Sequence, residues 1–387
     1  MINGSLLALT EAQAEVRQLA RDFAATDVAP LAAELDRDSK FDESLVAKLG
    51  HLGFLGMLIP EAYDGLGLDS LSYLLALEEL AAADASAAVL MSVHNSLPTQ
   101  MILKYGNDAQ RDRWLRPLAK GERVGCFALS EPDAGSDASS LRTQAVRDGD
   151  DWILDGTKSW VTNGNNPDAV IVAMVRTDTP DIRRGGRGIS AFILTPELAG
   201  FSVSKKENKM GLRASPTVQL RFDAMRVPGD RLIGEPGQGL VYAMQSLEHG
   251  RLGIAAQSIG IARRALELSV AYATERQQFG QHIAEFQGIQ FKLADMATRV
   301  TAARSLLHAT AAMKDRGGDV GAFSSMAKLT ASETAMWVTT QAVQVFGGNG
   351  YMKDYEVERL FRDAKVTEIY EGTSEIQRII IGRALTR

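Results

Sequence analysis

The stretch WILDGTKSWVTN, residues 152–163, marks a change in the character of the chain from helical to β. From about residue 121 to 230, short β-rich runs alternate with turn residues, which is typical of strands joined by turns. The pair Asp155-Gly156 divides the stretch, and this dipeptide is preferred in type I′ turns, so we predict a β-hairpin that turns at these two residues. The further runs AVIVAMV, ISAFIL and VQLRF extend the β region.

Apolar residues recur with helical spacing on both sides of the β region. The first amphipathic run begins at Thr10, which has capping-box spacing to Gln13, and we expect Pro30 to end it. A last helix is expected from Ser374, after long helical runs at roughly 240–274, 286–314 and 322–345. We therefore predict a mainly α protein with three domains: N-terminal helical (1–120), middle β (121–230) and C-terminal helical bundle (231–387).

Composition limits the partners of the chain. Its 387 residues carry a net charge of −6, whereas a nucleic-acid or anionic-membrane surface needs clustered excess cation. No run approaches the roughly 20 apolar residues of a spanning helix, so we expect neither nucleic-acid binding nor membrane insertion. The single Cys126 cannot close an intrachain disulfide, and a secretory signal pattern is absent. We expect a reducing compartment: the cytoplasm, or the mitochondrial matrix for a mature form.

Several common site motifs are missing. The chain has no GxxxxGK[ST] phosphate loop, no HExxH and no cysteine cluster, and its five His residues lack metal-ligand spacing. The segment GLGLDS, residues 65–70, approaches the dinucleotide fingerprint GxGxxG but lacks its third Gly and a preceding strand. We therefore expect no metal, and a Rossmann-type site has little support.

Three glycine-bearing segments are candidates for a ligand site. CFALSEPDAGSDAS (126–139) offers hydroxyls and backbone N–H groups for a polar ring edge or a phosphate, although an ordinary surface loop fits equally well. SWVTNG (159–164) places Trp160 and Thr162 on one face of a strand, which suits a flat heteroaromatic cofactor, although a core Trp is commoner. QVFGGNGY (344–351) permits either a helix C-cap or a close backbone approach to a ligand.

Glu371 is the most informative single residue. It lies between Tyr370 and Gly372 in IYEGTSEIQR, residues 369–378. Partial desolvation there would raise the pKa of the carboxyl and make it a stronger base. The alternative is an acid at a helix entry, favoured by the helix dipole, or a surface charge.

Five motifs in order, FALSEPDAGSD, SWVTNG, RQQFG, VFGGNGY and RDAKVTEIYEGTSEIQR, resemble the acyl-CoA dehydrogenase family from about residue 10 to the C-terminus. The resemblance implies an N-terminal helical domain, a middle β domain of barrel-like or sandwich form and a C-terminal four-helix bundle. It also implies a flavoprotein that uses FAD to remove two hydrogens from the α and β carbons of an acyl-CoA, giving a trans-2-enoyl-CoA. The electrons would pass to an electron-transferring flavoprotein.

The resemblance also assigns the site residues. Glu371 would take the α-proton, and the β-hydrogen would leave as hydride to flavin N5. FAD contacts would come from Phe127, Leu129, Ser130, Ser136, Trp160, Thr162, Thr373 and Glu375 and, in a neighbouring subunit, from Arg276, Phe279, Gln287, Gln344 and Gly348. Substrate contacts would come from Ser136, Glu248, Arg251 and Gly372. The intersubunit set implies a homotetramer built as a dimer of dimers.

Within the family, MSVHNSL, CFALSEP and YEGTSEIQR look most like the short-chain (butyryl) branch, so we expect a short, or short branched, acyl group. Glu248 stands where the family more often has Asp. Gly250 stands where long-chain and isovaleryl members carry their catalytic Glu, which favours Glu371 as the only base. Two other functions stay open: an oxidase-like enzyme that uses O2, and a non-catalytic relative that binds acyl-CoA or flavin.

Overall fold

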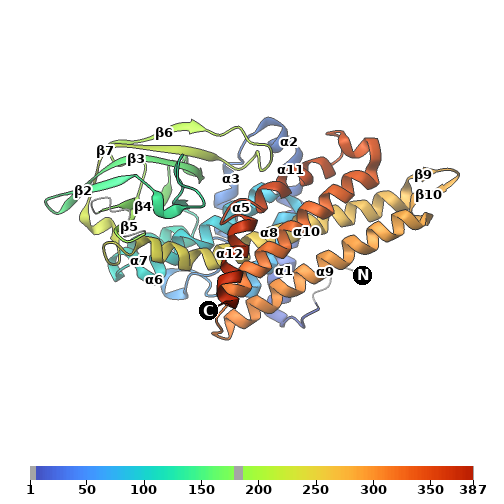
Figure 1. Cartoon of the computed structure of the whole chain (residues 1–387), viewed down its shortest axis with the longest axis horizontal. Helices are drawn as coiled ribbons and strands as arrows, with labels where there is room; N and C mark the ends of the chain where they lie inside the picture. The colour runs from blue at the N-terminus through green and yellow to red at the C-terminus, as the bar shows by residue number, and fades with distance from the viewer. Residues whose placement is uncertain (1–5, 178–185, 387) are drawn as a thin grey trace.

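The computed structural model describes residues 6–177 and 186–386, and it contains three parts (Figure 1). The strands of the large sheet gather at one end of the molecule, and the long C-terminal helices run from there to the opposite end, where β9 and β10 lie. The N-terminal helices pack against both. A mainly α protein with a middle β domain, as predicted, is therefore confirmed.

The N-terminal part is helical. Thr10 and Gln13 form the predicted capping box, in which Thr10 Oγ1 accepts from the Gln13 N–H at 3.2 Å and Gln13 Oε1 accepts from the Thr10 N–H at 3.0 Å. The expectation that Pro30 ends the first run is wrong, because a π-helical turn leads directly into α2 and Pro30 lies in the first turn of α2, where its missing N–H leaves no bond unmade. The helices are α1 (Glu11–Phe23), α2 (Ala29–Asp38), α3 (Ser44–His51), α4 (Ser70–Ala83), α5 (Ala85–Ser96), α6 (Pro98–Tyr105) and α7 (Asp108–Ala119).

The middle part is a mixed sheet. Among the described residues, eight strands join in the order β6-β7-β3-β2-β4-β5-β8, and β1 pairs in parallel with β4. Every residue of β4 is buried because alternate side chains enter two different apolar cores, which explains its unbroken apolar run. The strands are β1 (Val124–Ala128), β2 (Gln144–Asp148), β3 (Asp151–Thr162), β4 (Ala169–Arg176), β5 (Ile189–Leu194), β6 (Phe201–Lys206), β7 (Thr217–Val227) and β8 (Leu232–Ile233).

The predicted hairpin at Asp155-Gly156 is wrong. Strand β3 runs through both residues, and the chain turns instead at residues 149–150, between β2 and β3. The dipeptide lies at an irregularity in the pairing with β7, where Asp155 accepts from the Ala224 N–H at 3.0 Å. A Cβ on Gly156 would lie 2.6 Å from the Cα of Thr143. Asp-Gly here serves a β-bulge and a close strand contact, which the local sequence does not distinguish from a turn.

The C-terminal part contains the three long helices expected from periodicity, α8 (Gly239–Glu275), α9 (Gln287–Asp315) and α10 (Gly321–Phe346). Helices α11 (Val357–Thr367) and α12 (Ser374–Leu385) both pack on α10, and the last begins at the predicted Ser374. A short hairpin of β9 (Gln277–Gln278) and β10 (Gln281–His282) connects α8 to α9. No helix in the two described ranges combines the length and apolarity that crossing a membrane requires.

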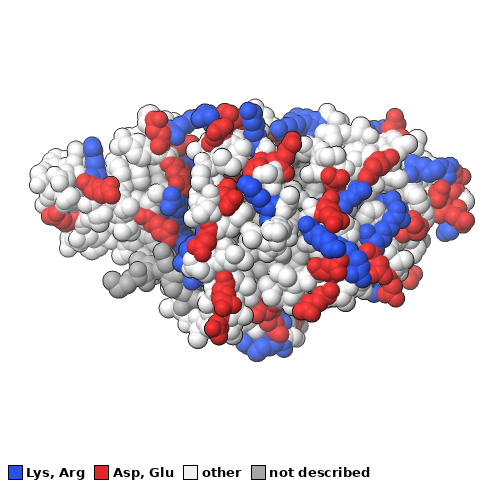
Figure 2. All heavy atoms as spheres, turned by 180° about the vertical axis from the view of Figure 1, so that it is seen from behind, with Lys and Arg blue, Asp and Glu red and all other residues white. Residues whose placement is uncertain are grey.

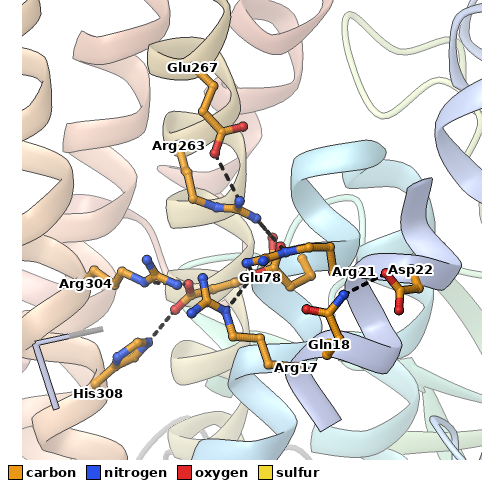
Figure 3. Close-up of polar contacts among 10 residues, drawn as sticks. Arg17, Gln18, Arg21, Asp22, Glu78, Arg263, Glu267, Arg304 and His308 are labelled. Atoms are coloured by element: carbon orange, nitrogen blue, oxygen red, sulfur yellow. Dashed lines mark hydrogen bonds and ion pairs between the residues drawn. The ribbon is translucent and has the colours of Figure 1, made fainter. Parts of the chain in front are cut away.

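A buried charged cluster joins the N-terminal and C-terminal helices (Figure 3). Its anions are Glu78 and Glu79 of α4, which are 0% and 3% exposed. Glu78 lies 2.8 Å from the Arg304 guanidinium and 2.6 Å from His308 Nε2, both on α9. Glu79 pairs with three arginines at 2.7 to 2.9 Å: Arg17, Arg21 and Arg263. The cluster therefore connects α1 and α4 to α8 and α9.

Candidate active site

Glu371 lies in the sharp turn between α11 and α12. Its φ is +53° and that of Gly372 is +95°, so two successive residues adopt the left-handed region. A non-glycine residue rarely occupies that region, and the surrounding structure must hold it there. Part of the hold comes from Tyr370, whose hydroxyl donates to Gln257 Oε1 of α8, while Gln257 Nε2 donates to the Ala85 carbonyl at 2.7 Å. The turn is thus anchored to the helices beneath it.

The Glu371 carboxylate is buried and unpaired. Neither carboxylate oxygen has a hydrogen-bond partner among the described residues. Burial raises the pKa of Glu371 to about 7, even though the charges of Lys328 and Arg251 act in the opposite direction. Its Oε2 lies so close to Gly250 of α8 that a Cβ there would overlap the carboxylate. A buried acid without a partner, with a pKa near neutrality, has the properties of a general base.

Two predicted substrate residues share a pocket. Glu248 and Arg251, both on α8, line a pocket of about 780 Å³ together with Gln238, Met244 and Ile380. Arg251 is 6% exposed, and its Nε has no partner in the part of the chain that the structure describes. The charge of Arg251 also acts on Glu371. The structure therefore places a buried cation, with an Nε–H that donates no hydrogen bond to a described residue, between this pocket and the candidate base.

The middle domain brings several predicted flavin residues together. Phe127 lies in β1 and is half-buried, and the loop after this strand carries Leu129 and Ser130. The Ser130 carbonyl accepts from the Ser159 N–H at 2.8 Å, which joins the loop to β3 beside Trp160. Trp160 has a φ of +58° and is 57% exposed. Thr162 follows two residues later in the same strand, whereas Ser136 lies farther along the loop and is exposed.

An ion pair that the sequence reading missed organises this loop. Glu131 accepts from the backbone N–H groups of Arg142 and Thr143 at 2.6 and 2.9 Å and from Lys158 Nζ at 2.7 Å. Lys158 also donates to the Leu129 carbonyl at 3.1 Å and is fully buried. Period-two spacing from the apolar residues of β3 places Lys158 on the inward face, and a lysine on such a face is the available signal for a buried pair.

The five residues predicted for a neighbouring subunit lie at the far end of the bundle (Figure 1). They surround the β9/β10 hairpin: Arg276, Phe279, Gln287, Gln344 and Gly348. Phe279, at the hairpin tip, is 95% exposed and borders an apolar pocket of about 420 Å³. The structure brings these residues to one place, but within one chain it does not bring them to Trp160 and Thr162.

Two predicted residues follow the candidate base directly. Thr373 is the N-cap of α12, with its hydroxyl 3.4 Å from the Ile376 N–H, and Glu375 is exposed in the first turn. Across residues 6–177 and 186–386, no three His, Cys, Asp or Glu side chains are arranged to hold a metal ion.

Models of the acyl-CoA dehydrogenase N-terminal, middle and C-terminal domains match residues 10–122, 126–225 and 237–386 in turn. The chain therefore belongs to the acyl-CoA dehydrogenase family, and it is a flavoprotein oxidoreductase of that family.

Individual relatives cover nearly the whole chain. A mitochondrial short-chain specific acyl-CoA dehydrogenase of Mus musculus is 47% identical over 98% of this chain and 91% of its own. The structure of butyryl-CoA dehydrogenase from Megasphaera elsdenii is 42% identical, with a TM-score of 0.96 over 98% of this chain and all of that one. A chain from a study of the electron transferring flavoprotein of Acidaminococcus fermentans is 44% identical, with a TM-score of 0.95 over 98% and 99% of the two chains.

Proposed function

We propose that this protein catalyses the FAD-dependent α,β-dehydrogenation of a short-chain, or short branched, acyl-CoA to the trans-2-enoyl-CoA, with Glu371 as the base. One observation carries the proposal: a fully desolvated carboxylate with no protein partner and a pKa raised to about 7. Such a group is costly to bury unless a ligand uses it. The short chain length is supported by the similarity to short-chain and butyryl-CoA dehydrogenases.

The middle domain fits a flavin. The exposed Trp160 ring and the half-buried Phe127 and Leu129 offer apolar surface to a flat ring system, and Thr162 follows Trp160 by two residues in β3. We assign the flavin and its pyrophosphate to these residues and to Ser130 and Ser136, of which Ser136 would also reach the CoA portion. We assign the adenosine half to Thr373 and Glu375. When bound, FAD would supply the acceptor for the β-hydrogen.

The protein's own groups have separate tasks. Glu371 would remove the α-proton, and proton transfer is efficient when the pKa of the base lies near the working pH. The backbone N–H of Glu371 donates no hydrogen bond to any described residue, so it is free to donate to the thioester oxygen as negative charge develops there. Arg251, Glu248 and Gly372 would border the acyl-CoA. Gly372 also adopts a φ of +95°, which favours glycine.

We extend the proposal to a homotetramer. The hairpin end of the chain exposes large apolar side chains, which mark interaction surfaces when they cluster: Phe279, Phe291, Tyr351 and Met352. Charges are sparse at this end, which lies on the left of Figure 2. Arg276 and its four companions would then contact the FAD of a neighbouring subunit. An electron-transferring flavoprotein would receive the electrons, and the cytoplasm remains the proposed compartment.

Anaerobic titration of the flavin-loaded protein with butyryl-CoA, isobutyryl-CoA and octanoyl-CoA tests the proposal. We expect butyryl-CoA, or its branched isomer, to bleach the flavin absorbance, and octanoyl-CoA to do so poorly. Glu371→Gln should retain FAD and acyl-CoA binding but show no bleaching. Full flavin reduction in that variant would refute the assignment of the base, and rapid reoxidation of the reduced protein by O2 would favour an oxidase.

A further inference from the structure

Lys328 is a buried lysine that the proposed mechanism does not yet use. It lies in the N-terminal third of α10 and is 0% exposed. Burying an ammonium group is unfavourable unless specific partners compensate for the lost hydration. Its Nζ donates to the carbonyl oxygen of Gly372 at 2.8 Å. Lys328 therefore contacts the residue that follows the candidate base.

A second buried side chain acts on the same turn. Gln377 of α12 donates through Nε2 to the Gly372 carbonyl at 2.8 Å and to the Glu371 carbonyl at 3.3 Å. Two consecutive carbonyls of a turn with positive φ values are thus held by side chains from two different helices. Because φ and ψ at these residues set the direction of the Glu371 side chain, these bonds fix where the carboxylate points.

The Lys328 ammonium group also interacts electrostatically with the Glu371 carboxylate. The charges that act on Glu371 are those of Lys328 of α10 and Arg251 of α8, and the Glu371 charge acts in turn on the hydroxyls of Tyr73 and Tyr370. Burial lowers the pKa of Lys328 to about 8, and Glu371 is the first of its charged neighbours to oppose that shift, ahead of Glu368 and Glu375, whereas Arg251 lowers it further. Lys328 and Glu371 thus favour each other's charged form.

We propose that Lys328 is a positioning residue for the base: it fixes the Gly372 carbonyl, and so the turn that carries Glu371, while its ammonium group stabilises the ionised carboxylate. The kinetic consequence rests on the proposed function, since it assumes that Glu371 takes the α-proton. The contact between Lys328 and the Gly372 carbonyl does not depend on that function.

The first test is the pH profile of flavin reduction by butyryl-CoA in Lys328→Met, with the exposed Lys40→Met as the control. Loss of the cation should move the ascending limb upward by about one pH unit, so that the rate falls roughly fivefold at pH 7 and roughly tenfold well below it. FAD content and KM should change little. The proposal would be overturned if the ascending limb of the Lys328→Met profile lay at the same pH as that of the wild type, or if the rate fell by the same factor at every pH.

The second test needs no turnover. We would measure the Tm of the flavin-loaded wild type, Lys328→Met, Glu371→Gln and the double variant at about pH 5 and about pH 8. If the two side chains interact as charges, their effects should add at the lower pH, where Glu371 is protonated, and deviate from additivity at the higher pH. Additivity at both values would refute the interaction. A wild type that butyryl-CoA fails to bleach would refute the proposed function and leave this result standing.

Discussion

Glu371 shows how one residue obtains its chemistry from its surroundings. A free glutamate is too weak a base at neutral pH to compete for the α-proton of a thioester. Here the carboxylate is removed from water and given no hydrogen bond, so its ionised form is destabilised and its pKa rises to about 7. Lys328 and Arg251 limit the rise, which keeps the group ionisable near neutrality.

The raised pKa of Glu371 predicts a pH dependence with a definite sign. If Glu371 takes the α-proton as proposed, flavin reduction requires its ionised form, so the rate should increase with pH through about 7. Because the folded state holds this proton more tightly than the unfolded chain, Glu371 contributes stability at low pH that is lost as pH rises from its ordinary value of 4.5 through about 7. Tm measured across this range should show a decrease that is absent in Glu371→Gln.

Gly250 predicts the sharpest single-residue effect. A methyl group there would overlap the Glu371 carboxylate, so Gly250→Ala should move the base and reduce the rate of flavin reduction by about a hundredfold or more. Gly382→Ala is the matched control, since this helical glycine faces open space. Stopped-flow measurement of flavin bleaching by butyryl-CoA compares the two variants. Near-normal rates in Gly250→Ala would mean that the carboxylate is not held against α8.

At the scale of the element, Glu131 shapes the loop after β1, to which we assign flavin binding. It holds two backbone N–H groups and the Lys158 ammonium, so Glu131→Gln should loosen the loop and weaken FAD affinity several-fold. Fluorescence titration of the flavin-free protein with FAD measures the change, with the exposed Glu122→Gln as control. Equal affinity in both variants would contradict the role of the ion pair.

The charged cluster around Glu78 connects elements that are distant in sequence. Burial alone would raise the pKa of Glu78, but Arg304 and His308 outweigh it and lower the pKa below its ordinary value of 4.5. The stability that Glu78 contributes is therefore present above pH 4.5 and lost as pH falls below it. Glu78→Gln should lower the free energy of unfolding by about 3 kcal/mol, because it leaves buried cations without their anion.

Denaturant unfolding at neutral pH measures this change, and Glu15→Gln, on the exposed face of α1, is its control. Equal unfolding midpoints for the two variants would show that the cluster does not hold the helices together.

At the scale of the whole molecule, the two sets of proposed FAD contacts bear on how subunits assemble. The β9/β10 hairpin, which follows Arg276, lies at the opposite end of the molecule from the sheet that contains Trp160 (Figure 1). The proposed homotetramer therefore predicts that a flavin bound beside Trp160 contacts Arg276 of another subunit. Subunit mixing tests this: Arg276→Ala and Glu371→Gln homomers should each be impaired, while hybrids should recover part of the activity, because Arg276 of one subunit completes the site with the intact Glu371 of another. Formation of the hybrids would be confirmed by mass spectrometry. If these hybrids recovered no activity and Arg276→Ala bound FAD with unchanged affinity, each site would lie within a single chain.

The sequence by itself determined the class of fold, the order of helices and strands, and the motifs that identify the family. These depend on local periodicity, capping and side-chain type, as at Thr10, Ser374 and the three long helices. The prediction from sequence was wrong at Asp155-Gly156 and at Pro30, because the local sequence at each is compatible with two conformations. Pairing with β7 selects the conformation at Asp155-Gly156, and continuation into α2 selects that at Pro30.

Tertiary structure alone decided the setting of Glu371. Gly250 lies 121 positions before Glu371, and Lys328 lies 43 positions before it. No local pattern therefore records that Gly250 leaves room for the carboxylate and that Lys328 binds the next carbonyl. The buried pair of Glu131 and Lys158 and the cluster around Glu78 depend on the same kind of long-range contact. The physical reason is that a pKa depends on burial and on nearby charge, and both are properties of packed helices and strands rather than of neighbouring letters in the sequence.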